Sequence, residues 1–584
     1  MTTTLYGVTD DNGETRVFRV SGNCSLLGGT WTHPGQPTFG KSTDANRSTV
    51  AYSHGYGVYH IIAEVGGNMS VGAAFTATAS GKSFDTDSNR GQGPGAGSSN
   101  CSASHAGWGG RSDGTLQAPY GTFRNPKTIG SSHKTRGGGC IEIAVSGALS
   151  LESGSSFSAD GIESSYYSGA GGSISIVAGS ISGASSFSAR GGNVTNGSYG
   201  GGGGGGRISI ILTGEGADFS NFTGTYSTHN TPGTVVGKQD GFGGTTYLET
   251  AAQGVGGGTL IVDGGRRGYY NRIISRGTPV SADDMAFRLS KIILRDNASL
   301  TIAGGSFYLA SATVETNNVL LASAAAANTI YFNAVDIELA PNMTLSDWHL
   351  HTTAGSTLRA GPSGNGTLTV SNNGKLYVNG STSLLGSLVV ASAGSVNHMT
   401  GGSSESYKLD LSVSGNVTVQ TGGTISATGA GYNKNTGPGA NSSNNVGMHG
   451  GRVSGALATK HCYGSITRPV NYGSGGGANN TSNGGGAIKL TVAGSLVNNG
   501  SVEANGLLAQ DYYPGAGGSV WVTASTISGD GKFTANGGLA KKSAAGGGMG
   551  SGGRVSLWLT SPGADFSSFT GYASALGGQM LSRR

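Results

Sequence analysis

The sequence predicts an all-β protein: a parallel β-helix (β-solenoid) with two duplicated glycine-rich modules and glycine-rich loop insertions. Three observations carry this prediction. Short segments alternate apolar and small polar residues, glycine separates these segments, and the strand-like pieces recur every 33 or 34 residues, starting at Ile141, Ile174 and Ile208. No stretch shows the 3.6-residue apolar stripe of an amphipathic helix.

The composition excludes several classes of protein. Glycine accounts for 111 of 584 residues, but it follows no three-residue period and proline is scarce, so the chain is not a collagen. Regular Val, Ile and Leu pairs with 22 Tyr and 16 Phe exclude a disordered tail. Polar residues interrupt the most apolar stretch, 319–332, which excludes a membrane span there. A net charge of +5 indicates no nucleic-acid partner.

A duplication organises the chain. Two segments match at an offset of 344 to 348 residues. The matches, first copy before second, are 67–71 and 415–419, 93–96 and 437–440, His105 and His449, Tyr120 and Tyr463, Pro126 and Pro469, 137–143 and 484–490, 169–172 and 515–518, and 217–224 and 564–571. Internal repeats of this kind are typical of stacked architectures.

The duplication divides the chain into four predicted parts. They are an N-terminal β region or cap (1–59), module 1 (60–250), a central segment with shorter coils (251–407) and module 2 (408–584). In the central segment we expect strands around Leu300, Leu358, Leu368 and Leu376. Glycine-rich insertions such as 200–206 are expected to leave the coils as loops. A set of antiparallel sandwiches is the alternative, but hairpins need shorter connections than this spacing provides.

The two modules resemble glycine-rich modules of large extracellular proteins of bacteria and protists. The resemblance rests on residues 93–96, His105, 109–111, Tyr120, 137–143, 169–176 and Arg207 with their second copies, and it covers the two outer modules. Those modules are similar to pectin-lyase-like right-handed parallel β-helices. The resemblance implies that fold and a surface location, and it implies no particular chemistry.

Few polar residues are retained in both modules. They are His105 and His449, Tyr120 and Tyr463, Arg207 and Arg554, Asp218 and Asp565, with Arg111 and Arg452 as an approximate pair. One interpretation is a carbohydrate or catalytic pocket in each module. We favour the other, in which His and Arg donate hydrogen bonds to backbone carbonyls of loops that have few side chains of their own.

The sequence predicts no catalytic residue and no cofactor. Enzymes of this fold that cleave polysaccharides cluster carboxylates in a groove, whereas here Asp160 becomes Asn505 and Glu142 becomes Lys489 in the second copy. The segment with Asp85, Asp87 and Asn89 has the oxygen spacing of a calcium loop, but it lacks the required Gly and Glu and has no second copy. We interpret it as a solvated loop.

Four cysteines are too few for a disulfide framework. Cys101 and Cys140 are replaced together in module 2, by Asn445 and Ala487. This joint loss is expected if the two form a disulfide across adjacent coils. Cys24 and Cys462 are expected to be unpaired or to pair with another chain.

Sequons for N-glycosylation favour secretion, although residues 1–6 show no signal peptide, as in a cytosolic or a mature chain. Asn-X-Ser/Thr occurs 16 times, more often than the composition predicts. The sequons begin at Asn23, Asn46, Asn68, Asn100, Asn193, Asn196, Asn221, Asn297, Asn342, Asn365, Asn379, Asn416, Asn441, Asn479, Asn480 and Asn499. We therefore expect an extracellular or cell-surface glycoprotein.

The resulting hypothesis is a non-enzymatic structural protein that associates with itself, end to end or laterally, or with other surface proteins, in a filament, appendage or surface layer. Two alternatives stay open. One is an adhesin that stacks glycans on exposed Trp108, Tyr120 and Tyr463. The other is a polysaccharide lyase or glycosidase, including a phage tail-spike type, which would depend on Asp218 or Asp565.

Overall fold

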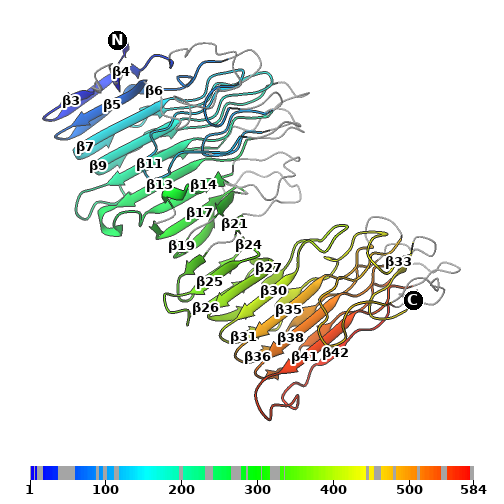
Figure 1. Cartoon of the computed structure of the whole chain (residues 1–584). Helices are drawn as coiled ribbons and strands as arrows, with labels where there is room; N and C mark the ends of the chain where they lie inside the picture. Colours follow the sequence, from blue (N-terminus) through cyan, green and yellow to red (C-terminus); the bar gives the residue numbers. More distant parts are fainter. Residues whose placement is uncertain are drawn as a thin grey trace, which may run out of the picture. The chain divides into compact units, whose positions relative to one another are not determined.

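The computed structural model of the chain describes residues 2–4, 7–8, 17–36, 59–86, 91–96, 101–110, 117–195, 201–229, 241–264, 278–284, 287–296, 298–303, 306–315, 329–333, 336–441, 446–452, 462–477, 482–508, 513–540 and 549–578. The chain divides into two compact units, Met1–Tyr331 and Phe332–Arg584, and this boundary falls inside the predicted central segment. Both units are built of β-strands (Figure 1). Among the described residues, helix is confined to two 3-10 turns, η1 (Ala251–Gln253) and η2 (Ala282–Asp284).

The strands of unit 1 are short and follow one another closely along the chain. They are β1 (Thr2–Thr4), β2 (Gly7–Val8), β3 (Phe18–Val20), β4 (Cys24–Thr32), β5 (Tyr59–Val65), β6 (Met69–Thr78), β7 (Cys140–Leu151), β8 (Ser156–Ser158), β9 (Ser173–Gly183), β10 (Ser186–Ser188), β11 (Arg207–Leu212), β12 (Thr225–Ser227), β13 (Thr245–Thr250), β14 (Thr259–Asp263), β15 (Thr278–Pro279), β16 (Arg288–Leu289), β17 (Lys291–Arg295), β18 (Ser299–Ala303), β19 (Ser306–Leu309) and β20 (Ala312–Glu315), and β21 (Thr329–Asn333) spans the boundary.

Unit 2 has the same kind of strands. They are β22 (Asp336–Leu339), β23 (Thr344–Ser346), β24 (His349–Thr353), β25 (Ser356–Ala360), β26 (Thr367–Ser371), β27 (Lys375–Leu385), β28 (Ser387–Val390), β29 (Ser395–Asn397), β30 (Leu409–Val413), β31 (Val417–Val419), β32 (Thr424–Ser426), β33 (Ala440–Asn441), β34 (Val446–Gly447), β35 (Ala487–Val492), β36 (Leu496–Asn498), β37 (Ser501–Glu503), β38 (Ser519–Ala524), β39 (Ile527–Ser528), β40 (Lys532–Thr534), β41 (Arg554–Leu559) and β42 (Tyr572–Ser574).

Three parallel ladders run through unit 1. The first joins β3, β5, β7, β9, β11 and β13. The second joins the first halves of β4 and β6 to the second halves of β7 and β9. The third joins the second halves of β4 and β6 to β8, β10 and β12. Successive segments of the chain therefore enter the first, second and third ladder in the same order.

Unit 2 repeats this arrangement. Its first ladder joins β22, β25, the second half of β27, β30, β35, β38 and β41. Its second ladder joins β23, β26, β28, β31, β36 and β39. Its third ladder joins β24, the first half of β27, β29, β32, β37, β40 and β42. The all-β prediction, with parallel sheets, is confirmed.

The predicted strand starts Ile141, Ile174 and Ile208 are direct neighbours across the first ladder of unit 1. Their counterparts Ile488, Val520 and Val555 are neighbours in the same way in unit 2. The repeat length is therefore the length of chain between one strand of a ladder and the next. The strands predicted around Leu300, Leu358, Leu368 and Leu376 also exist, and all four leucines are fully buried.

Alternation of side chains across each strand forms a thin apolar core. In β35 the side chains of Ile488, Leu490 and Val492 are buried, while Lys489 and Thr491 between them are partly exposed. Burying one such apolar side chain stabilises the fold by about 1.5–3 kcal/mol. Because each strand contributes only two or three of them, the core depends on stacking many strands.

Aromatic side chains stack along the third ladder of unit 1. The ring centroids of Phe75 and Phe157 lie 6.0 Å apart, those of Phe157 and Phe187 lie 5.1 Å apart, and those of Phe187 and Tyr226 lie 6.1 Å apart. In the third ladder of unit 2 the neighbours of Phe533 are Val502 and Ala573, and its aromatic contact is with Phe569 at 5.3 Å, outside the ladder. Each aromatic pair adds about 0.5–1.5 kcal/mol beyond its buried area.

The chain reverses direction between β13 and β14. These strands are antiparallel neighbours, with Thr245 opposite Val262, and the ladder then continues in parallel through β17 and β20. The turn between them contains η1 and two glycines with positive φ, Gly254 at 72° and Gly256 at 76°. This tight turn therefore places an antiparallel pair at the beginning of the predicted central segment, where only shorter coils were expected.

The glycine-rich segments do not leave the strands as loops, contrary to the prediction. Residues 201–206 are buried. The N–H groups of Gly204, Gly205 and Gly206 donate to the carbonyl oxygens of Ala103 (2.9 Å), Phe242 (2.9 Å) and Ala189 (2.8 Å). Glycine segments have no side chains, so their backbones can approach closely enough to form hydrogen bonds with one another. These segments therefore pack together instead of extending into solvent.

Both units contain such a packed region beside the strand ends. We call it the glycine layer and define it as residues 101–110, 130–139, 169–172, 201–206 and 241–244 in unit 1 and 446–451, 473–476, 484–486, 515–518 and 550–553 in unit 2. A Cβ atom at Gly138 would overlap the carbonyl oxygen of Ala159, and one at Gly485 would overlap that of Ala504. The glycine runs before the strands are therefore required by close packing.

Candidate functional site

The retained histidine, tyrosine and arginine of module 1 lie together. The rings of His105 and Tyr120 are 4.8 Å apart. The Arg207 guanidinium donates to the Tyr120 carbonyl oxygen through Nη2 at 2.9 Å and Nε at 3.3 Å. His105 Nδ1 lies 2.7 Å from the Gly171 carbonyl oxygen, and its Nε2 lies 2.7 Å from Thr128 Oγ1. The cluster therefore ties the loop that carries Tyr120 to the glycine layer.

Module 2 repeats this cluster except at His449 Nε2, which has no hydrogen-bond partner among the described residues. The rings of His449 and Tyr463 are 4.7 Å apart. Arg554 donates to the Tyr463 carbonyl oxygen at 3.0 Å and 3.1 Å, and His449 Nδ1 lies 2.9 Å from the Gly517 carbonyl oxygen. The Tyr463 hydroxyl lies 2.8 Å from Ser474 Oγ, as the Tyr120 hydroxyl does from its serine. We call the two copies the loop clamps.

Burial keeps the clamp histidines neutral. It lowers the pKa of His105 to about 3, with help from the charge of Arg207, and the pKa of His449 to about 4. Burial also lowers the pKa of Arg207 to about 10, against the opposing charge of Asp284, and the guanidinium is still charged at neutral pH. Both nitrogens of His105 already have partners, so the module 1 clamp holds backbone and leaves its imidazole no nitrogen for proton transfer.

The aromatic residues proposed to stack glycans are not arranged for that role. Tyr120 and Tyr463 are partly buried, each packs on a histidine ring, and each hydroxyl bonds the backbone. Trp108 is also partly buried. The prediction of an exposed aromatic face at these residues is wrong, because all three are partly buried and the loop clamps use the two tyrosine rings.

The retained aspartates lie in surface turns. Asp218 Oδ1 accepts hydrogen bonds from the N–H and the hydroxyl of Ser220, at 2.9 and 2.5 Å, and Asp565 Oδ1 accepts from Ser567 at 2.9 and 2.6 Å. These bonds lower the pKa of both carboxyls. Each carboxylate thus stabilises a turn, the same turn in each module.

The calcium-like segment is only partly described. Asp85 Oδ1 lies 2.7 Å from Arg136 Nη2, so an arginine neutralises this carboxylate. Asp87, Asn89 and Arg111 lie outside the described residues.

The predicted disulfide is not formed. Cys140 carries a free thiol, so it is not joined to Cys101. Its Sγ lies 3.9 Å from Glu142 Oε1 and 4.0 Å from the Pro126 carbonyl oxygen. Cys24 and Cys462 also carry free thiols. The joint loss of two cysteines in module 2 therefore has another cause than a shared bond.

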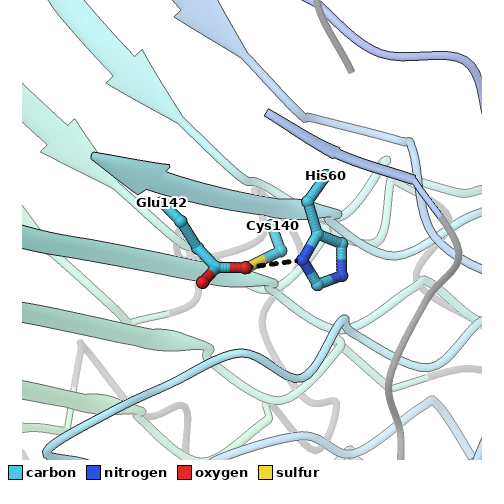
Figure 2. Close-up of side chains that lie close together, drawn as sticks. All are labelled: His60, Cys140 and Glu142. Atoms are coloured by element: carbon cyan, nitrogen blue, oxygen red, sulfur yellow. Dashed lines mark hydrogen bonds and ion pairs between the residues drawn. The ribbon is translucent and has the colours of Figure 1, made fainter. Parts of the chain in front are cut away.

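Cys140 belongs to a cluster with His60 and Glu142 (Figure 2). His60 lies just at the start of β5, and the other two lie at the start of β7, its neighbour in the first ladder. His60 Nδ1 is 2.7 Å from Glu142 Oε1, and Lys127 Nζ is 3.1 Å from Glu142 Oε2. The nitrogen, sulfur and oxygen ligand atoms of the three residues lie within 4.8 Å of one another.

Burial opposes ionisation of both Glu142 and Cys140, but only Glu142 has partners that outweigh it. At Glu142, burial is outweighed by the hydrogen bond and charge of His60 and by the charge of Lys127, which lower the Glu142 pKa. Burial and the nearby Glu142 charge raise the pKa of the Cys140 thiol well above its usual value. The group thus holds a protonated thiol beside an ionised carboxylate.

Module 2 differs at every position of this cluster. The aligned residues of His60, Lys127, Cys140 and Glu142 are Lys408, Val470, Ala487 and Lys489. There Lys489 Nζ lies 3.2 Å from Asp410, and Lys408 Nζ lies 2.5 Å from Glu405. The change of Glu142 to Lys489 alone does not indicate a cluster in the sequence. The signal that does is the simultaneous change of His60, Cys140 and Glu142 together with Lys127.

The described sequons differ in accessibility. The asparagines are exposed at Asn23, Asn68, Asn221, Asn342, Asn365, Asn416 and Asn499, partly buried at Asn193 and buried at Asn379, and the other sequon side chains lie outside the described residues. Asn68 Oδ1 accepts the N–H of Ala148 at 2.8 Å, and Asn416 Oδ1 accepts that of Ser495 at 2.9 Å. Some of these asparagines therefore have a structural role, which accounts for part of the excess.

In the part of the chain that is described, no helix is long and apolar enough to cross a membrane. No family model, curated protein or solved structure matches the chain.

Proposed function

We propose that the protein is a non-enzymatic structural glycoprotein of the cell surface or the extracellular space, and that it is the subunit of a filament, appendage or surface layer. On this proposal each unit is a right-handed β-solenoid of the pectin-lyase-like type. The support is the constant order in which the chain enters three parallel ladders, repeated through both units.

The use of the retained polar side chains carries the proposal. The loop clamps and the two aspartate turns bond to the protein's own backbone, and each bond recurs in both modules. An enzyme that keeps a duplicated site keeps groups that reach a substrate. Here the residues that survived duplication hold loops in place, which is what a structural protein needs.

The open edge of β41 and β42 provides a surface for self-association. Among the described residues, β41 bonds to β38 and β42 bonds to β40, and no strand lies on their other edges. Near this edge Trp558, Phe566, Tyr572 and Leu576 are 43, 44, 57 and 60% exposed. Unpaired backbone groups next to exposed apolar side chains favour addition of a strand from a second copy.

Sedimentation velocity on the full chain at increasing micromolar concentrations tests this proposal. We expect oligomers that grow with concentration and do not close at a fixed size, because end-to-end contacts are heterologous. Tyr572→Lys and Leu576→Lys should shift the protein toward monomer. Val255→Lys, at an exposed position in a turn of unit 1, is the matched control. A monomer at every concentration would count against self-association.

Intact mass and glycopeptide mapping of protein from its native source test the location. We expect glycans at exposed sequons such as Asn221 and Asn365, and none at the buried Asn379. A chain without glycans would remove the support for secretion and would favour the alternative that the protein is a viral fibre.

A further inference from the structure

The cluster of His60, Cys140 and Glu142 brings three kinds of metal ligand together in a nearly closed place. The His60 residue is 9% exposed, Cys140 is 0% exposed, and the Glu142 side chain is 16% exposed. Figure 2 shows the imidazole Nδ1, the sulfur and one carboxylate oxygen facing the same point. The three residues lie at the starts of two neighbouring strands of one ladder, β5 and β7. The backbone pairing of these strands therefore fixes the spacing of the side chains.

The donor set selects a class of cation. A thiolate, an imidazole and a carboxylate suit zinc and its neighbours among the transition metals, whereas calcium and magnesium require mostly oxygen ligands. The ligand atoms lie within 4.8 Å of one another, close enough that small side-chain movements would surround one ion at bond lengths of about 2.0–2.3 Å. Three protein ligands leave one position of a tetrahedral site open.

We propose that His60, Cys140 and Glu142 bind one divalent transition-metal ion of the zinc class. The Cys140 thiol releases its proton to solvent as the sulfur–metal bond forms, and His60 Nδ1 and a Glu142 oxygen supply the other two bonds. This proposal is independent of the proposed structural role. It departs from the sequence interpretation, which expected no metal ligand here.

Two features of the cluster lower the affinity for the ion. Lys127 Nζ lies 3.1 Å from Glu142, so its charge competes with the ion, but its side chain is 46% exposed and can turn to solvent. With the metal on Nδ1, the imidazole proton lies on Nε2, a buried atom without a hydrogen-bond partner among the described residues. Both effects weaken binding relative to a closed four-ligand site.

A catalytic thiol is the competing interpretation of the same three residues. Cysteine nucleophiles are partly exposed and have a depressed pKa. Cys140 is fully buried, so a substrate cannot reach its sulfur, whereas a single ion needs only the space between the three ligand atoms. The geometry therefore favours a ligand over a nucleophile.

Cobalt(II) titration of the full chain, first treated with a chelator, tests the proposal. We expect one equivalent of cobalt to produce the thiolate-to-cobalt charge-transfer band and the intense visible bands of a tetrahedral site, and zinc to remove them. Cys140→Ala introduces the residue that module 2 has at the aligned position, and it should abolish the charge-transfer band. Glu142→Gln should weaken binding at least about tenfold. Cys24→Ser and Cys462→Ser are matched controls and should leave the spectrum unchanged.

One variant separates metal binding from simple misfolding. Lys127→Val copies the aligned residue of module 2 and removes the competing charge, so it should tighten cobalt binding several-fold. Tighter binding at one equivalent is the opposite of what loss of the fold around the three ligands would produce. Absence of the charge-transfer band in the unmodified chain would overturn the proposal. So would a band that persists in Cys140→Ala and disappears in either control.

Discussion

Modules 1 and 2 hold their loops in the same way but differ in charge beside the first ladder. Both keep the histidine, tyrosine and arginine of the loop clamp, with bond lengths that agree within a few tenths of an ångström. By contrast, the cluster around Glu142 in module 1 becomes a lysine-rich site with Lys408 and Lys489 in module 2. Duplication preserved the loop-clamp contacts to backbone and replaced the charged contacts around Glu142.

The difference has a physical reason. A side chain that donates to a carbonyl oxygen cannot be exchanged without leaving that oxygen unpaired in a buried place. A pair of charged side chains can be exchanged together if the new pair also matches. Asp410 and Lys489 in module 2 satisfy each other as His60 and Glu142 do in module 1.

Substitutions in the glycine layer should have the largest effect and should be equal in the two modules. Gly138→Ala and Gly485→Ala each push a Cβ into a carbonyl oxygen that belongs to a fixed strand end. We expect each to lower the free energy of unfolding by more than about 3 kcal/mol. Chemical denaturation followed by circular dichroism measures this. Gly451→Ala, where a Cβ meets only ordinary contact, is the control. A small effect at Gly138 would contradict the close packing.

The two clamp arginines should differ. Arg207 is 1% exposed and faces the charge of Asp284, whereas Arg554 is partly exposed. Arg207→Met leaves a buried carboxylate without its counter-charge and should cost about 3–5 kcal/mol. Arg554→Met should cost about 1–2 kcal/mol. Hydrogen exchange of 117–131 and of 462–474 measures each clamp separately. Equal losses would show that the Asp284 charge is unimportant.

Acid should weaken unit 2 more than unit 1. Burial lowers histidine pKa values to about 3 or 4 at two described positions of unit 1 and four of unit 2, namely His33, His105, His349, His351, His398 and His449. A lowered folded-state pKa gives stability that is present above about pH 6.5 and is lost as the pH falls toward the folded value. Each enclosed histidine loses about 2 kcal/mol between pH 6.5 and 5.

One group in unit 1 acts against this loss. Burial raises the pKa of Asp284 to about 6, so its protonation on acidification stabilises the folded state. Hydrogen exchange at pH 7 and pH 5, corrected for the intrinsic rate, compares the units within one chain. Greater acid sensitivity of unit 1 would refute this assignment.

The aromatic stack should produce the smallest difference. Phe187 lies between Phe157 and Tyr226, whereas Phe533, at the matching place in module 2, lies between Val502 and Ala573 in its ladder. Phe187→Leu should therefore cost about 1 kcal/mol more than Phe533→Leu, the difference being the lost aromatic pairs. Thermal unfolding of the two variants measures it. A larger loss at Phe533 would show that ring pairing is not the cause.

Strand positions were predictable because their signal is local. Ile141, Ile174 and Ile208 stand at the start of alternating segments, and they are neighbours in one ladder. The hairpin of β13 and β14 was not predictable from the repeat, because a short turn at Gly254 reverses the chain without altering the alternation. The packing of 201–206 was missed because a run of glycines gives no side-chain signal for burial or exposure.

The candidate site was predictable only in part. His105, Tyr120 and Arg207 were found as retained residues, and the structure brings them together. Their positions, 102 residues apart at the extremes, give no indication of contact. His60 was not found at all, because its closeness to Glu142 depends on the pairing of β5 with β7.

In the glycine layer we expect slow hydrogen exchange in segments that have no regular secondary structure. Its amides, such as those of Gly204 and Gly485, are buried and bonded to carbonyl oxygens at 2.9 and 2.8 Å although neither residue lies in a strand. An exchange map would therefore assign these segments to the slowest-opening part of each unit. In a set of related sequences the same segments would be the least tolerant of change while offering no side chain to any ligand, so invariance there would report on packing and not on chemistry.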